Sequence, residues 1–211
     1  MTRNIAILAT VLVVLFLGGM FAATTFIAPD DEFAQCRASA VAGGAAEIGG
    51  PFTLISETGE TVTEKEVIDQ PSLVYFGYTF CPDVCPIDAA RNADAAAILE
   101  ERGTIVKPVF ITVDPKRDTP EVVREFTDYM HPRMLGLTGS DEQISAASKA
   151  YRAYFKIHEA EEGDEDFYLV DHSTQTYLMF PDKGFVEFFR RSDTAEQMAD
   201  RVQCFVEASQ G

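Results

Sequence analysis

The chain has 211 residues, and its 34 acidic against 17 basic side chains give it a formal net charge of −17. Nucleic acid and anionic lipid headgroups repel so negative a surface, so we exclude both as partners of that surface. Once an apolar N-terminal segment is set aside, about 180 residues remain, enough for one domain that buries its own core.

The N-terminal segment has the pattern of a membrane anchor. No charged residue occurs within Ile5–Ile27, a run long enough to cross a bilayer core of roughly 30 Å as a helix. Arg3 precedes the run and Asp30 follows it, so the positive-inside rule places the N-terminus in the cytoplasm. The alternative is a cleaved signal peptide, but the run exceeds the usual apolar length of one. We predict that residues 1–28 form a single-pass anchor in a bacterial inner membrane, with the C-terminal domain in the periplasm.

A tether and a hairpin are predicted next. Residues 29–47 end in a stretch rich in Ala and Gly, which predicts a flexible tether. The domain over residues 48–211 then opens with two short strands, Phe52–Ile55 and Thr61–Thr63, joined by a turn at Glu57–Glu60.

Strands and helices then alternate before a final hairpin and helix. Apolar runs predict the strands, and Ser or Thr followed by Pro or acidic residues predicts helix starts. This order indicates an α/β fold with a mixed sheet. The predicted helices are Ile87–Arg102, Thr119–Met130, Ser140–Phe155 and Thr194–Ala208, and the predicted strands are Leu73–Tyr78, Ile105–Val113, Leu135–Leu137, Tyr168–Val170, Thr176–Phe180 and Phe185–Phe189, the last three as an antiparallel set.

Cys81 and Cys85 lie where a buried strand leads into a helix, with Pro86 suited to the first helical turn. A helix N-terminus stabilises a thiolate, which is the form that attacks disulfides and binds soft metals. Positions four apart share one helical face, so the two sulfurs can reach each other or a single ion. The alternative is a buried structural pair.

Cys36 and Cys204 are the remaining cysteines. In an oxidising compartment, two exposed thiols are a liability, so these residues are candidates for a structural disulfide that ties the tether to the last helix. The alternative for Cys204 is an ordinary core position on that helix.

Three motifs in order resemble the Sco/SenC/PrrC family: Tyr75–Pro86, Val113–Pro120 and Asp171–Ser173. The resemblance covers about Ile48–Ala208. It implies a thioredoxin-like fold with a mixed central sheet, an N-terminal hairpin extension and one N-terminal transmembrane helix.

The resemblance further implies that Cys81, Cys85 and His172 bind one copper ion. Two thiolates and an imidazole suit Cu(I), and the same set with an added oxygen can accept Cu(II). Around these ligands, Asp83 either tunes the thiolate charge or is a solvent-facing turn residue, and Asp171 either orients His172 or caps a strand end.

The family likeness implies a copper metallochaperone that delivers copper to the binuclear copper site of cytochrome c oxidase subunit II. A second periplasmic copper chaperone or a thioredoxin-like reductant is a further expected partner. One alternative is a thiol-disulfide oxidoreductase that uses Cys81 and Cys85 to reduce the acceptor's cysteines, and another is a periplasmic redox sensor. Three residues between the thiols, and His172 in the facing loop, favour metal binding.

The other candidate features have weaker interpretations. His131 follows a predicted helix end, where it can complement the helix dipole, and His158 can pair with a carboxylate. The acidic run Glu159–Asp166 can attract a basic partner or cations, although a solvated loop is the simpler interpretation.

Overall fold

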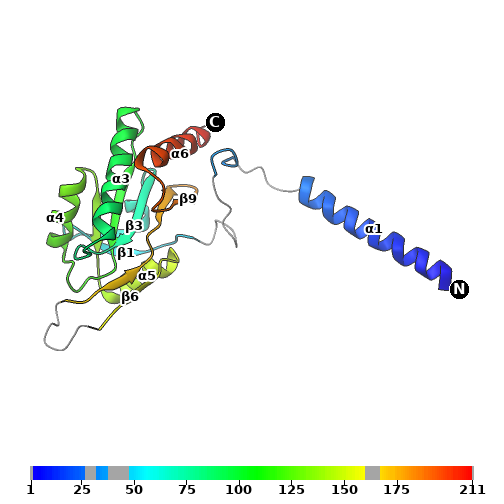
Figure 1. Ribbon diagram of the computed structural model, residues 1–211, viewed down its shortest axis with the longest axis horizontal. Helices are drawn as coiled ribbons and strands as arrows, with labels where there is room; N and C mark the ends of the chain where they lie inside the picture. The colour runs from blue at the N-terminus through cyan, green and yellow to red at the C-terminus, as the bar shows by residue number, and fades with distance from the viewer. Residues whose placement is uncertain (1, 27–31, 38–47, 160–166, 211) are drawn as a thin grey trace. The chain divides into compact units, whose positions relative to one another are not determined.

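The computed structural model describes residues 2–26, 32–37, 48–159 and 167–210. The chain divides into two units, Met1–Ala34 and Gln35–Gly211. The first unit contains helix α1 (Thr2–Phe26), drawn in blue in Figure 1. Within the described residues, no helix combines the length and the apolarity that crossing a bilayer requires. Most of the predicted tether, and all of the acidic run after Glu159, lie outside the described residues.

The second unit is built on a seven-stranded mixed sheet. The strands lie in the order β2-β1-β5-β4-β3-β8-β9. The three central strands β5, β4 and β3 are parallel, and the other neighbouring pairs are antiparallel. The predicted N-terminal hairpin forms and adds its two strands beside β5. The strands are β1 (Thr53–Ser56), β2 (Thr61–Thr63), β3 (Ser72–Gly77), β4 (Lys107–Thr112), β5 (Leu135–Thr138), β8 (Thr176–Phe180) and β9 (Gly184–Phe189).

Helices cover the sheet. The crossovers from β3 to β4 and from β4 to β5 run in the same direction, and because such crossovers are right-handed, their helices cover the same face. The last helix packs beside the first of these, as Figure 1 shows for α3 and α6. The helices of this unit are α2 (Glu64–Val67), α3 (Val84–Glu101), α4 (Pro120–Met130), α5 (Asp141–Ala150) and α6 (Ala195–Ala208).

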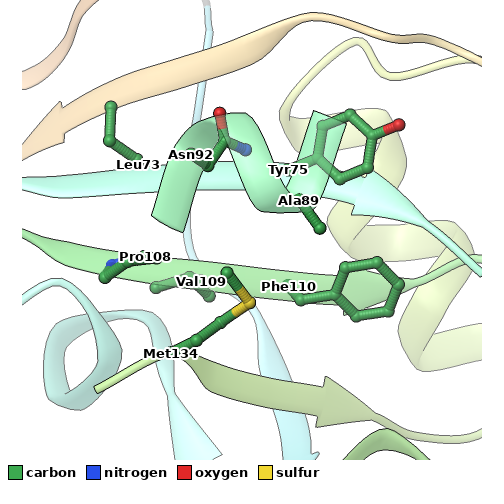
Figure 2. Close-up of a pocket in the computed structure, with 8 residues that line it drawn as sticks. All are labelled: Leu73, Tyr75, Ala89, Asn92, Pro108, Val109, Phe110 and Met134. Carbon is green, nitrogen blue, oxygen red and sulfur yellow. The ribbon is translucent and has the colours of Figure 1, made fainter. Parts of the chain in front are cut away.

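Strand β3 is buried on both faces and supports α3. Its side chains alternate: the Tyr75 hydroxyl donates to Asp88 of α3 at 3.1 Å, while the Phe76 ring lies 5.4 Å from the ring of Tyr151, which follows α5. Figure 2 shows the packing between α3, β3, β4 and Met134, where about 0 Å³ is left for a water molecule. The start of α3 therefore rests on a dry, filled core.

Three helices begin where capping residues predict. Thr119 accepts a hydrogen bond from the Val122 amide ahead of Pro120 at the start of α4. Ser140 and Thr194 form capping boxes at the starts of α5 and α6. Each cap satisfies amides that the first helical turn leaves without a carbonyl partner.

The segment after α5 differs from the prediction. The helix ends at Ala150 instead of continuing to Phe155, and Arg152 adopts a left-handed φ of 53°. Strand β6 (Phe155–Ile157) then pairs with β7 (Val170–His172) in a separate two-stranded sheet. The prediction that a strand at Tyr168–Val170 joins the final antiparallel set is therefore wrong, because its partner is Phe155–Ile157, a segment for which no strand was predicted.

Candidate metal centre

Cys81 and Cys85 lie at the N-terminus of α3. The chain leaves β3 at Gly77, and the Cys81 amide donates to the Tyr78 carbonyl at 3.3 Å in the connecting turn. The helix begins at Val84, three residues before the predicted start. Here the Cys85 amide donates to Cys81 Sγ at 3.4 Å. Cys81 Sγ therefore accepts from one of the amides that a helix N-terminus leaves without a partner.

His172 reaches the same point from the end of β7. Its Nε2 lies 3.1 Å from Cys85 Sγ, and its Nδ1 lies 2.9 Å from the Ser173 carbonyl oxygen. A carbonyl only accepts, so Nδ1 is the donor and Nε2 keeps its lone pair in the neutral ring. The edges of Tyr75 and Tyr78 enclose the imidazole, with ring centroids 6.1 and 5.8 Å away.

The three predicted ligands form one cluster in the described part of the chain. One donor atom each from Cys81, Cys85 and His172 lies within 4.8 Å of the others. Cys81 is 8% exposed and Cys85 is 0% exposed. Two sulfurs and a borderline nitrogen at this spacing suit a soft cation, whereas hard cations prefer oxygen donors.

The environment separates the two thiols electrostatically. Hydrogen bonding from Cys85 is the main cause that lowers the pKa of Cys81 to about 3, while backbone N–H groups add to this effect and burial opposes it. The same interaction, together with burial, raises the pKa of Cys85. Cys81 is thus the thiolate of the pair, and Cys85 is the thiol beside it.

A buried carboxylate ties the cysteine loop to the sheet. Asp118 accepts from the Thr79 amide at 2.9 Å, from the Thr79 hydroxyl at 2.6 Å and from the Thr112 hydroxyl at 2.6 Å. Its side chain is fully buried, and burial raises the pKa of this carboxyl. Thr79 stands two residues before Cys81, so Asp118 fixes the path by which the chain reaches the first thiol.

A second network joins the cysteine loop to the histidine segment. The Arg117 guanidinium pairs with Asp114, donates to the Tyr168 carbonyl at 3.0 Å and lies 3.6 Å from the Tyr168 ring centroid. The Tyr168 hydroxyl donates to Asp114 at 2.7 Å. We call Asp114, Arg117 and Tyr168 the arginine clamp. Arg117 also lies 5.0 Å from the ring of Phe80, the residue before Cys81, so the clamp contacts both halves of the cluster.

Comparison with known proteins identifies the family. The SCO1/SenC family model matches residues 40–207. The chain belongs to the SCO1/SenC family. SenC of Rhodobacter capsulatus is 56% identical over 209 residues, which cover 99% of this chain and 93% of SenC.

Solved members of the SCO1/SenC family share the fold. Arabidopsis thaliana ScoI with copper bound is 42% identical, with a TM-score of 0.70 over 76% of this chain and 99% of that one. Bradyrhizobium japonicum ScoI with copper bound is 36% identical, with a TM-score of 0.66 over 74% and 98%. The thioredoxin-like Sco fold predicted from the resemblance is confirmed. Copper, the predicted ion, is bound in both of these relatives.

For Asp83 and Asp171, support of the ligands was one of two interpretations, and both side chains have other surroundings in this SCO1/SenC domain. The Asp83 side chain is exposed and makes no capping hydrogen bond to α3, and Asp83 acts on Cys81 through its backbone N–H. The Asp171 carboxylate lies 2.8 Å from His158 Nε2, across the β6–β7 pair. The interpretation that Asp171 orients His172 is corrected: the Ser173 carbonyl holds that ring, because alternation along β7 turns neighbouring side chains to opposite faces.

The sequence prediction missed the roles of Asp114, Arg117, Asp118 and Tyr168. The Val113–Pro120 motif contains the first three as part of the family pattern, but no role at the site was predicted for them. The signal that could have found them is two acids and an arginine directly after a buried strand that runs parallel to the strand before the cysteines, because such strand ends meet at one edge of the sheet.

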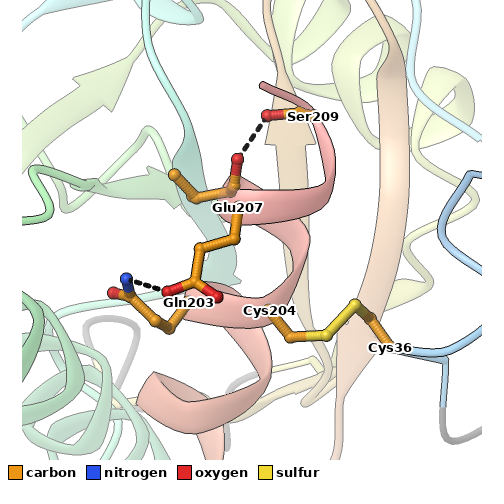
Figure 3. The surroundings of a disulfide bond; sticks show 6 residues. Cys36, Gln203, Cys204, Glu207 and Ser209 are labelled. Carbon is orange, nitrogen blue, oxygen red and sulfur yellow. Dashed lines mark hydrogen bonds between the residues drawn. A yellow bond between two sulfur atoms is a disulfide. The ribbon is translucent and has the colours of Figure 1, made fainter. Parts of the chain in front are cut away.

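Cys36 and Cys204 are joined in a disulfide with a Cα–Cα distance of 5.7 Å, as Figure 3 shows. This bond lies near the C-terminal end of α3, where the Thr104 hydroxyl donates to Gln203 at 2.7 Å. Cys85 stands at the other end of that helix, whose 18 residues span roughly 27 Å. The joined pair and the free pair thus lie at opposite ends of α3.

Proposed function

We propose that this chain is a copper metallochaperone that binds one copper ion through Cys81, Cys85 and His172. The observation that carries the proposal is the cluster itself, with its three donor atoms within 4.8 Å of one another. Two thiolates and an imidazole match the ligands that copper prefers in proteins. The copper-bound Sco relatives support the choice of metal.

The proposed acceptor is the binuclear copper site of cytochrome c oxidase subunit II, as the family resemblance implies. Copper is cargo in this proposal, held by side chains that can also release it. Cys81 is the more exposed of the two buried cysteines, so we expect an acceptor's thiolates to approach from the Cys81 side. Because a disulfide cannot ligate, the pair must be reduced before loading, and binding releases the remaining thiol proton.

Copper titration of the reduced full-length protein tests the proposal. Absorption and paramagnetic resonance spectra are expected to report sulfur and nitrogen ligation at one equivalent. In H172A, copper binding should weaken by at least about 100-fold, more than the loss of an outer hydrogen-bond partner costs, while dithiol–disulfide exchange at Cys81 and Cys85 changes little.

His158 provides the matched control, because it lies on the same hairpin but points to Asp171. Replacing it in H158A should weaken copper binding by less than about tenfold. Equal losses of copper affinity in H172A and H158A would show that both substitutions act by disturbing the β6–β7 pair and that His172 has no specific role as a ligand. Equal losses of copper binding and of exchange in H172A would contradict a metal-ligand role for His172.

A second candidate function is reduction of the acceptor's cysteine pair. The exposures of Cys81 and Cys85, 8% and 0%, favour it, because Cys81 is the more accessible of two buried sulfurs and Cys85 lies next to it as the resolving thiol. In that reaction the two thiols become a disulfide, and two electrons pass to the acceptor's disulfide, which opens to two thiols. H172A separates the two functions when the acceptor is assayed, since a reductase still reduces the acceptor's cysteines without the imidazole, whereas a chaperone no longer delivers copper to it.

We also propose that residues 1–28 anchor the protein in a bacterial inner membrane, that residues 29–47 form a tether, and that residues 48–211 lie in the periplasm. The uncharged run Ile5–Ile27 and the flanking charges support this arrangement. After cell fractionation, the chain should resist alkaline extraction from membranes, and added protease should digest the domain only once the outer membrane is permeabilised. Recovery of the full-length chain in the alkaline supernatant would contradict the membrane anchor.

A further inference from the structure

A pocket of about 630 Å³ adjoins the cluster on the His172 side. His172 forms one part of its wall, and Arg190 and Arg191 form another, above Phe188. None of the described residues that line it is acidic, although acids outnumber basic residues two to one in the chain. The pocket is therefore a place where an otherwise acidic molecule attracts anions.

The two arginines have different neighbours. Arg191 Nε lies 3.4 Å from the carboxylate of Asp88, which is 1% exposed and accepts from the Tyr75 hydroxyl at 3.1 Å. The Arg190 guanidinium lies 5.9 Å from the Phe188 ring centroid, and the described residues give it no acidic partner. Arg191 approaches Asp88 through Nε. The two terminal nitrogens of Arg191 can therefore donate a forked pair of hydrogen bonds to a ligand carboxylate.

The size and position of the pocket define its ligand. Small-molecule pockets range from about 300 to 1,000 Å³, whereas a stable protein partner covers about 800 Å² of surface, so this pocket suits a small molecule. Its wall includes His172, one ring nitrogen of which lies within 4.8 Å of both Cys81 Sγ and Cys85 Sγ. A ligand whose carboxylates meet the arginines therefore brings its far end to the cysteine pair, where thiol chemistry takes place.

We propose that the pocket between His172 and Arg190–Arg191 binds a small thiol carrying carboxylates, for which reduced glutathione is the probe, and that this thiol reduces the Cys81–Cys85 disulfide. The proposal deepens the proposed function and rests on it in one respect: copper loading requires the reduced pair. An acidic segment of a protein partner is the competing occupant and is an outcome of the test below.

The reaction balances with two thiols. The first ligand thiolate attacks Cys81, the more exposed sulfur; the protein disulfide breaks, a mixed disulfide forms at Cys81, and Cys85 leaves as a thiolate. A second ligand thiolate attacks the ligand sulfur of the mixed disulfide and releases Cys81. Two electrons reach the protein, the oxidised ligand disulfide departs, and the two ligand protons pass to Cys85 and to solvent.

The test compares thiols of different charge on the oxidised full-length protein. Alkylation followed by mass spectrometry counts the thiols of Cys81 and Cys85 only, so opening of Cys36–Cys204 does not contribute. The measured quantity is the ratio of the reduction rate by glutathione to the rate by neutral 2-mercaptoethanol. We expect R190E to lower this ratio about tenfold, within the range of electrostatic effects on association. The ratio for cationic cysteamine should rise.

R124E is the matched control, because Arg124 is an exposed arginine on α4 outside the pocket. Its ratio should stay within about twofold of the wild-type value, as for surface substitutions away from a site. A ratio in R190E equal to that in R124E would overturn the proposal.

A second measurement identifies the occupant and does not depend on R190E folding. S-methylglutathione keeps the carboxylates but cannot react, and it should slow reduction of the wild-type protein by glutathione through competition. No competition would show that the arginines act only by long-range attraction or serve an acidic protein segment, and would also overturn the proposal. Neither assay contains metal, so a copper titration that fails leaves these results intact, and a failure here leaves copper binding untouched.

Discussion

The two cysteine pairs of this domain place the same functional group in opposite settings. Cys36 and Cys204 are 168 residues apart in sequence and are joined. Cys81 and Cys85 are four apart, are both free, and lie within reach of an imidazole. The first pair closes a long loop, while the second lies at a helix N-terminus that favours a thiolate.

The contrast teaches that surroundings, not cysteine itself, divide structural from chemical roles. Among the described residues, the one cluster of possible metal ligands is Cys81, Cys85 and His172. The disulfide-bonded pair, Cys36 and Cys204, is therefore not part of such a cluster in the described part of the chain. At the N-terminal end of α3, His172 and the Cys85 amide contact two free sulfurs, which can meet an ion or an exchange partner. Substitutions at each end should therefore have separable effects.

The largest expected effect on stability comes from removing the joined pair. A variant with both Cys36→Ser and Cys204→Ser should lose about 2–5 kcal/mol of unfolding free energy, because a cross-link over so long a loop no longer restricts the unfolded chain. Urea unfolding measures this loss. Copper affinity measured on the same variant should match the wild type, and a parallel loss of affinity would show that the two ends are coupled.

A methyl group placed beneath the free pair should have the next largest effect. In Gly77→Ala the added carbon would lie 2.8 Å from the Tyr75 ring and 3.1 Å from Cys85 Sγ. Overpacking of this kind costs about 1–3 kcal/mol, and the displaced sulfur should also weaken copper binding, as titration would measure.

Gly136→Ala is the control for that substitution, because its methyl would lie against Val123 Cγ1, away from the cluster. It should lower stability to a similar extent and leave copper affinity unchanged. If both variants weaken copper binding equally, general loosening of the domain is the cause, and the contact between Gly77 and Cys85 has no special role.

The smallest expected effect concerns the arginine clamp. Tyr168→Phe removes the hydroxyl that donates to Asp114 at 2.7 Å but keeps the ring beside Arg117. Unfolding free energy should fall by about 1 kcal/mol, and copper affinity should fall a few-fold, because the histidine segment is held less firmly. Tyr154→Phe changes an exposed ring next to β6 and should alter neither the unfolding free energy nor the copper affinity. Equal effects in the two variants would show that the arginine clamp does not support the copper ligands.

Most of the sheet could be predicted from the sequence because its signals are local. The apolar run that became β3 and the caps at Thr119, Ser140 and Thr194 each specify an element from a few neighbouring residues. The segment from Phe155 to Ile157 could not be assigned in that way. Its strand conformation depends on a partner 13 to 17 residues further along the chain. The preceding helix ends near Arg152, whose φ is left-handed, and an arginine does not signal that conformation in a sequence.

The candidate site likewise combines residues that local sequence could predict with residues that it could not. Cys81 and Cys85 are close in sequence, so their convergence follows from helix geometry alone. The approach of His172 depended on a family resemblance, since no local pattern places a residue 87 positions further along the chain against Cys85. Asp171 shows the limit of sequence adjacency, because the neighbour of a ligand on a strand faces away from it.

The β6–β7 pair that carries His172 stands apart from the main sheet, and a two-stranded ribbon is marginal by itself. Its contacts with the rest of the domain include those of Tyr168 with Arg117 and of His172 with Tyr75 and Tyr78. Local opening of the ribbon therefore costs less free energy than opening β3. We accordingly expect the imidazole to be the first of the three donors to leave the cluster during local unfolding. An ion held there could be handed over by releasing nitrogen before sulfur, with the sheet beneath still intact.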